Sequence, residues 1–223
     1  MQIHQVKSRS ANSYIIDENN RLMVIDVALR SEKKVIDYVT NSMNRSLQDV
    51  DLVACTHGHT DHMGGLRRLA VDCHSDIGMP SLTSLWRERL CQLLLLLLPG
   101  YWLDRISSWI LHPGSLDSSV RFTRLLPGTS IPGFDDWLVV HTPGHTGDSC
   151  CYFHRPSRSL ISGDTLLASG KTNNVVLPSI YSSRSKLEGS IAELRGLDPV
   201  AIYPGHGSVL CGRDLLSNIT GLG

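Results

Sequence analysis

Histidine and aspartate residues that could bind a metal occur at four places along this chain. Three of its ten histidines lie in the run His57-Gly58-His59-Thr60-Asp61-His62, and His145, Asp164 and His206 follow further along. Imidazole nitrogens and carboxylate oxygens are the ligands that zinc and the neighbouring divalent metals prefer. A single such histidine would more often be a turn residue satisfied by backbone hydrogen bonds. Five histidines and two aspartates together indicate a metal site.

The spacing of these residues fits that chemistry. His57 and His59 are separated by one residue, so at the end of an extended strand they face the same side. Each of the four groups directly follows a predicted strand and lies in a turn that contains Gly, Pro or Thr. Loops at strand ends are where an α/β scaffold presents its chemistry. We therefore expect the groups to meet at one edge of the fold.

The elements that must position these loops alternate between strands and helices. Residues 13–16 and 22–25 predict a β-hairpin, and residues 31–43 predict a helix with Ser31 as its N-cap. Further strands are expected at 51–55, 138–140 and 200–203, a second hairpin at 150–153 with 160–161, and a helix at 186–197. Alternation of this kind is typical of an α/β fold.

Composition narrows the class of protein. The 223 residues carry 21 basic and 21 acidic side chains, so the formal net charge is zero, and a general nucleic-acid binder is not expected. The six cysteines form no CxxC pair, the N-terminus lacks the apolar core of a signal peptide, and the apolar run 93–98 is too short to span a membrane. These features favour a cytoplasmic protein without a transmembrane segment.

Four motifs, taken in order, resemble the signature of the metallo-β-lactamase superfamily. They are the run 56–62, which contains HxHxDH, then Thr142-Pro143-Gly144-His145-Thr146, Ser162-Gly163-Asp164-Thr165 and Tyr203-Pro204-Gly205-His206-Gly207. The resemblance covers residues 14–210. It implies an α/β fold that is a four-layer αββα sandwich, and a single domain over residues 1–223 with the metals at one edge.

Carried over by motif position, the resemblance implies two metal positions and a small-molecule substrate. The ligands of the first would be His57, His59 and His145, those of the second Asp61, His62 and His206, and Asp164 would bridge them. Asp26 matches an aspartate that the family often carries near its site, and its role as an orienting residue or as a simple loop cap is left open.

The same resemblance implies the chemistry. Two divalent metal ions, zinc in the first instance with iron or manganese as alternatives, lie about 3.5–4 Å apart in such sites and hold a hydroxide between them. The hydroxide attacks an ester-type bond in a thioester, a lactone or a phosphotriester. Asp61 and Asp164 are the expected catalytic carboxylates.

The ligand set separates the subclasses of the superfamily. Metallo-β-lactamases proper lack the bridging aspartate, and this sequence has Asp164 in that position. The sequences of the motifs around His145 and Asp164 are similar to those of glyoxalase II-type thioesterases. These enzymes carry a helical C-terminal domain, which we expect to be absent here because 17 residues follow His206 (223 − 206). Small lactonases share the ligand set. The alternative to a hydrolase is an oxidoreductase similar to the mononuclear iron persulfide dioxygenases.

One segment stands apart from these motifs. Residues 81–113 form an apolar insertion, and the stretch 85–111 holds six consecutive leucines and three of the four tryptophans. A helix that is apolar on every face needs a partner. We expect this cap to line a pocket for a lipophilic substrate, to form a homodimer contact or to touch a membrane surface.

Overall fold

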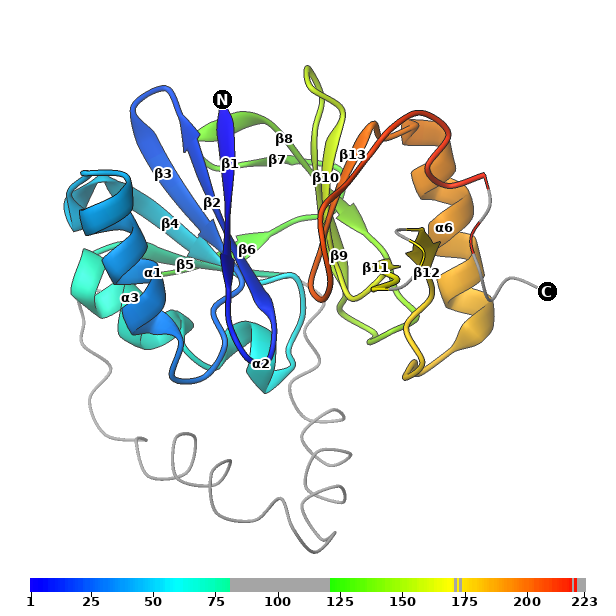
Figure 1. Ribbon diagram of the computed structural model, residues 1–223, viewed down its shortest axis with the longest axis horizontal. Helices are drawn as coiled ribbons and strands as arrows, with labels where there is room; N and C mark the ends of the chain where they lie inside the picture. The colour runs from blue at the N-terminus through cyan, green and yellow to red at the C-terminus, as the bar shows by residue number, and fades with distance from the viewer. Residues whose placement is uncertain (81–120, 171, 173, 218, 220–223) are drawn as a thin grey trace, which may run out of the picture.

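The computed structural model describes residues 1–80, 121–170, 172, 174–217 and 219. Two six-stranded sheets face each other, and helices cover their outer faces (Figure 1). In the first sheet the strands follow one another in chain order, from β1 to β6. These strands are β1 (Gln2–Lys7), β2 (Asn12–Glu18), β3 (Arg21–Ile25), β4 (Val50–Ala54), β5 (Asp76–Pro80) and β6 (Phe122–Leu125).

The second sheet has the order β14-β13-β10-β9-β8-β7. Its strands are β7 (Ser130–Ile131), β8 (Phe134–His141), β9 (Cys150–His154), β10 (Ser159–Gly163), β13 (Ala201–Pro204) and β14 (Leu210–Cys211). A small two-stranded sheet pairs β11 (Leu167–Ala168) with β12 (Val175–Val176). Among the described residues the α-helices are α1 (Glu32–Asp37), α2 (Thr60–Met63), α3 (Leu66–Cys73) and α6 (Arg184–Leu197), and a 3-10 helix spans Leu47–Asp49.

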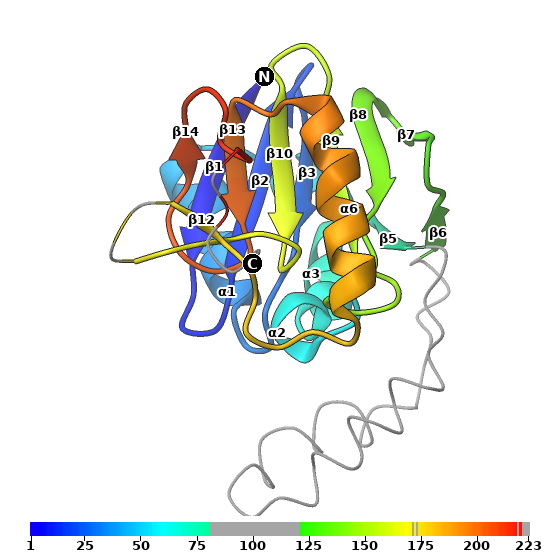
Figure 2. The same ribbon diagram turned by 90° about the vertical axis from the view of Figure 1, so that its right-hand side faces the viewer.

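Strand alternation builds three apolar layers. In β2, Ile15 packs in the cluster beneath α1 and α3, whereas its neighbours Tyr14 and Ile16 pack between the two sheets with Trp137. The second sheet repeats this pattern on its other face, where α6 contributes Leu187 among others (Figure 2). Two sheets that are each apolar on both faces need a helical layer on each outer side.

Strand direction explains why the histidine loops meet. β3 and β4 are parallel, so the loops after Ile25 and Ala54 leave the first sheet at the same edge. β8 and β10 are each antiparallel to β9, and β10 is parallel to β13, so these three also point the same way. The loops that carry His145, Asp164 and His206 therefore leave the second sheet at one edge.

The predicted α/β sandwich is confirmed, but the first helix differs from its prediction. The structure has an α-helix only at Glu32–Asp37, followed by a π-helical turn at Tyr38–Ser42. Ser31 occupies the N-cap position, but its side chain makes no capping bond, because its hydroxyl donates to the carbonyl of Ala28 at 2.7 Å.

Two other expectations concern the apolar insertion and membrane-spanning helices. The cap predicted at 81–113, with the homodimer contact at 85–111, lies outside the described residues, which resume at 121. Among the residues that are described, no helix has the length and apolar character needed to cross a membrane.

A stability prediction follows from Gly189, in the interior of α6. A Cβ at this position would meet no atom within 4 Å, and glycine destabilises a helix interior by roughly 0.5–1 kcal/mol relative to alanine. We expect Gly189→Ala to raise the free energy of unfolding by about that amount and Tm by about 1–4 °C in urea and thermal melts. Gly128→Ala is the control. Its φ of +78° disfavours a side chain, so this substitution should not raise the free energy of unfolding. A Gly189→Ala protein no more stable than the parent would contradict the prediction.

Candidate metal centre

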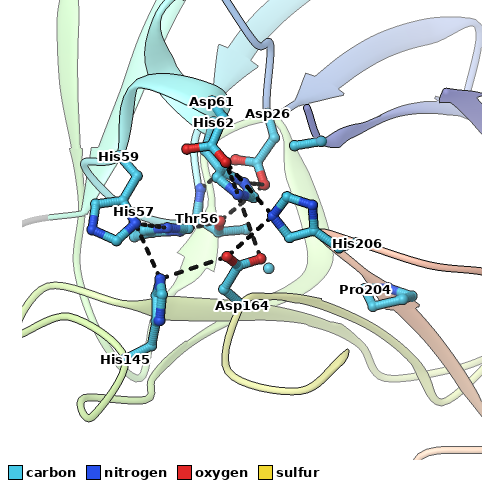
Figure 3. Close-up of polar contacts among 12 residues, drawn as sticks. Asp26, Thr56, His57, His59, Asp61, His62, His145, Asp164, Pro204 and His206 are labelled. Atoms are coloured by element: carbon cyan, nitrogen blue, oxygen red, sulfur yellow. Dashed lines mark hydrogen bonds and ion pairs between the residues drawn. The ribbon is translucent and has the colours of Figure 1, made fainter. Parts of the chain in front are cut away.

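The seven predicted site residues come together at one edge of the sandwich (Figure 3). The first sheet supplies the loop after β4 and the short helix α2, and the second supplies the loops after β8, β10 and β13. The side chains brought together are those of His57, His59, Asp61, His62, His145, Asp164 and His206. The structure thus places within one small region residues that span 150 positions of sequence (206 − 57 + 1).

Three histidines form the first group. The Nδ1 atom of His59 lies 3.1 Å from Nε2 of His57 and 3.1 Å from Nε2 of His145. His57 and His145 are buried, and His59 is partly exposed. Three ring nitrogens that face one another at this distance can surround one cation.

The second group consists of Asp61, His62 and His206, whose ligand atoms lie within 4.8 Å of one another. Asp164 lies between the two groups. Its Oδ1 is 3.4 Å from Nε2 of His62, and its Oδ2 is 3.6 Å from Nε2 of His145 and 3.3 Å from Nε2 of His206. One carboxylate therefore faces histidines of both groups.

The donor set fits divalent cations. Nε2 of His62 and Oδ1 of Asp164 are buried and have no hydrogen-bond partner. Buried polar atoms are almost always paired, so two such atoms facing each other need a ligand to satisfy them. Imidazole and carboxylate ligands suit zinc and iron.

The pKa values of the site have identifiable causes. Burial lowers the pKa of His57 well below its usual range and that of His59 to about 4, so both rings are neutral and keep a free lone pair. Burial alone would raise the pKa of Asp164, but the neighbouring rings of His206 and His62 hold it far below its usual range. For His62, burial lowers the pKa, but Asp26 and Asp164 together raise it above its usual value, so a cation at this ring displaces a proton.

Asp26 supports one histidine of each group. Thr56 donates its amide to Oδ1 of Asp26 at 2.7 Å and its hydroxyl to Oδ2 at 2.9 Å, which leaves the hydroxyl oxygen to accept from Nδ1 of His57 at 3.0 Å. Nδ1 of His62 donates to Oδ2 of Asp26 at 2.8 Å. Both rings are thereby oriented with Nε2 toward the centre. The carboxylate of Asp26 is thus an orienting group.

Two glycines allow the loops to approach this closely. At Gly163, where φ is +50°, a Cβ would lie 2.4 Å from Oγ1 of Thr56. At Gly205, a Cβ would lie 2.3 Å from Oδ1 of Asp164 and 2.6 Å from Cε1 of His62. Gly205 is the position where any side chain would collide with the centre itself.

A further His/Asp/Glu group lies at the other end of the sandwich. It consists of Glu18, Asp136 and His154. Nδ1 of His154 accepts the amide of Ser157 at 3.2 Å, so the proton of a neutral ring is on Nε2, which donates to Oε1 of Glu18 at 3.1 Å. This nitrogen has no lone pair left for a cation. The group is a hydrogen-bonded link between β2 and β9.

Fold and site together define the class: a four-layer α/β sandwich with two adjoining His/Asp groups joined by one carboxylate. The family model of the metallo-β-lactamase superfamily matches residues 7–206. The chain belongs to this superfamily, as the four motifs predicted.

The curated relatives include hydrolases. Probable metallo-hydrolase YqjP of Bacillus subtilis is 30% identical over 191 residues, which is 74% of this chain and 57% of the relative. Probable metallo-hydrolase YflN of the same organism is 27% identical, over 99% of this chain and 89% of the relative. An atrochrysone carboxyl ACP thioesterase of Aspergillus fumigatus is 23% identical, over 96% of this chain and 41% of the relative. The chain spans little more than half of YqjP and less than half of the thioesterase. These relatives support an enzyme of this superfamily at the level of the class.

Solved structures share the fold. A metallo-β-lactamase family protein from Thermus thermophilus superposes with a TM-score of 0.62 and 18% identity, over 97% of this chain and 76% of that chain. The chemotaxis sensor ODP, solved as a peroxy diiron species, superposes with a TM-score of 0.64 and 15% identity, over 94% of this chain and 85% of that chain. At these identities the likeness concerns the fold alone.

Proposed function

We propose that the chain is a metal-dependent hydrolase that cleaves an ester-type bond in a small molecule. The observation that carries this proposal is the carboxylate of Asp164, which faces histidines of both groups at 3.3–3.6 Å. A carboxylate between two sets of three protein ligands supports a site for two cations with room left for water.

The first cation would be held by His57, His59 and His145 and the second by Asp61, His62 and His206, and Asp164 would be shared. Zinc is the proposed metal, and iron is the alternative that the diiron neighbour supports. When bound, such cations lower the pKa of water towards about 7 and stabilise the negative charge that develops on the substrate. We also propose one domain over residues 1–223, since both sheets contribute to the same centre.

Two carboxylates of this chain take part in the chemistry. The side chain of Asp61 is 29% exposed, whereas that of Asp164 is 8% exposed. Asp61 therefore faces both solvent and the centre, and we assign the carboxylate oxygen of Asp61 that would not bind the cation to accept a proton from the attacking water. Asp164 stays ionised and holds the two ligand groups at a fixed separation.

The bond cleaved is a thioester, a lactone or a phosphotriester, and a relative named as a thioesterase supports the first. A lipophilic substrate is supported by the segment beside His145. Nδ1 of His145 lies 2.7 Å from the carbonyl of Ile180. Ile180 is 76% exposed, and Tyr181 next to it is 42% exposed. Exposed apolar side chains at the margin of a site are suited to bind apolar ligands.

Ile180→Ser tests this substrate class. The substitution removes apolar surface while the backbone carbonyl that accepts from His145 remains. We expect KM for long acyl or aryl substrates to rise about 5–10-fold, with kcat and the KM of short substrates nearly unchanged, because burying one such side chain contributes about 1.5–3 kcal/mol when complete. An equal change for short and long substrates would contradict a contact between Ile180 and the substrate.

A substrate panel tests the reaction class. Metal-depleted protein and protein reloaded with zinc, manganese or iron are assayed on a thioester, a lactone, a phosphotriester and a β-lactam, with dissolved oxygen monitored. We expect hydrolysis of an ester-type bond that requires metal and consumes no oxygen. Oxygen consumption with a persulfide substrate and one iron per chain would instead establish the dioxygenase alternative.

The role of Asp26 is testable through metal affinity. Asp26→Ala leaves the amide of Thr56 and Nδ1 of His62 without their partner. We expect both cations to bind about 10–100-fold more weakly in competition with a chromophoric chelator. Asp17→Ala removes a carboxylate of β2 that is paired with Arg45, away from the centre, and serves as the control. Equal metal affinity in Asp26→Ala and the parent would show that the carboxylate orients neither ring.

A further inference from the structure

The loop that carries His206 is held by its backbone carbonyls. It follows β13 and turns at Gly207, where φ is +95°. The carbonyl of Gly205 accepts the amide of Asn12 at 2.8 Å, and the amide of Gly205 donates to the carbonyl of Gly163 at 2.8 Å. The loop is therefore tied to the first sheet on one side and to the Asp164 loop on the other.

Asn12, at the start of β2, makes further contacts with this loop. Its side chain is buried, and Nδ2 donates to the carbonyl of Pro204 at 2.9 Å and to that of Gly207 at 3.0 Å. The hydroxyl of Tyr14 donates to the same Pro204 carbonyl at 2.7 Å. One amide side chain of the first sheet thus spans the segment on either side of His206 in the second sheet.

His206 depends on its loop more than His57, His62 and His145 depend on theirs. His57, His62 and His145 are oriented by Thr56, Asp26 and the carbonyl of Ile180, respectively. In the described part of the chain, the contacts recorded for the His206 ring are with Asp61, His62 and Asp164, which are themselves candidate ligands. The position of this ring is then set by the backbone from Pro204 to Gly207.

We propose that Asn12 is a positioning residue that fixes the loop of His206 and, through it, the second cation position. Tyr14 assists it through the shared Pro204 carbonyl. The proposal rests on the proposed function for the role of the cation, whereas the attachment of the loop by Asn12 is independent of it. The consequence is a selective one: losing the Nδ2 donors weakens the second position and leaves the His57, His59 and His145 group intact.

Titration of zinc into the metal-free protein, followed by calorimetry, tests the selective effect. For Asn12→Ala we expect the second binding event to weaken about 10–100-fold and the first to change less than about twofold. Tyr14→Phe, which keeps the ring and loses one donor, is expected to weaken the second event about 2–10-fold. Glu18→Gln, on the same strand but in the link to His154, is the matched control and should leave both events unchanged.

Amide hydrogen exchange in the metal-free protein supplies a readout that needs no cation. We expect the Gly205 amide to exchange at least tenfold faster in Asn12→Ala than in the parent and Glu18→Gln proteins. Unchanged exchange and an unchanged second binding event would overturn the proposal, and Tyr14→Phe decides in the same way if Asn12→Ala fails to fold. A parent protein that binds a single cation would instead overturn the dinuclear function, while the exchange data would still decide whether Asn12 holds the loop.

Discussion

Replacing Asp164 with alanine is expected to lower kcat by about 100-fold or more and to remove at least one of the two proposed cations. The carboxylate lies 3.4 Å from His62 and 3.3 Å from His206, and its Oδ1 is buried without a hydrogen-bond partner. Without it, two close cations would be left with less negative charge between them. Elemental analysis and steady-state kinetics on the same preparation measure both effects.

The control for this substitution is Asp135→Ala, an exposed carboxylate on β8 outside the centre. It should keep the metal content and kcat of the parent. A fully loaded and fully active Asp164→Ala protein would contradict the assignment of Asp164 as the shared carboxylate, whatever the reaction.

Gly205→Ala is expected to damage the centre almost as severely without removing any polar group. The added Cβ would lie 2.3 Å from Oδ1 of Asp164 and 2.6 Å from Cε1 of His62, so the carboxylate or the ring must shift. A displacement of about 1 Å at a catalytic group can lower the rate about 100-fold. We expect a fall in kcat of that order and the loss of at least one cation, measured as for Asp164→Ala.

Gly170→Ala provides the matched comparison, because a Cβ there meets no atom of the described residues within 4 Å. Its kcat and metal content should equal those of the parent. If Gly205→Ala binds two cations with parental kcat, the loop of His206 is not packed against Asp164 as the structure describes.

The sequence alone predicted the architecture well where its pattern was local. The hairpin of β2 and β3 and the helix α6 follow from apolar alternation and helical spacing, and the structure has both. The edge strand β1 was missed, since only Val6 in it is buried and its pattern is weak. The helix expected at 31–43 was also misjudged, because spacing does not distinguish an α-helix from the π-helical turn that continues it.

The candidate site also has features that the sequence predicts and features that it does not. That the seven His and Asp side chains lie together could be predicted, because their types and order are distinctive. The supporting contacts could not, because they join distant positions: Thr56 to Asp26, and Asn12 to Pro204 and Gly207. A small polar residue beside a buried strand carries no signal of its partner until the strands are placed.

The most direct test of the central claim is the number of cations that full activity requires. Metal-free protein is titrated with zinc while bound metal and hydrolytic activity are measured together. The account predicts that activity reaches its maximum at two equivalents per chain and stays well below it at one. Full activity at one equivalent, or in protein that holds no metal, would contradict the proposal of a dinuclear hydrolase built on Asp164.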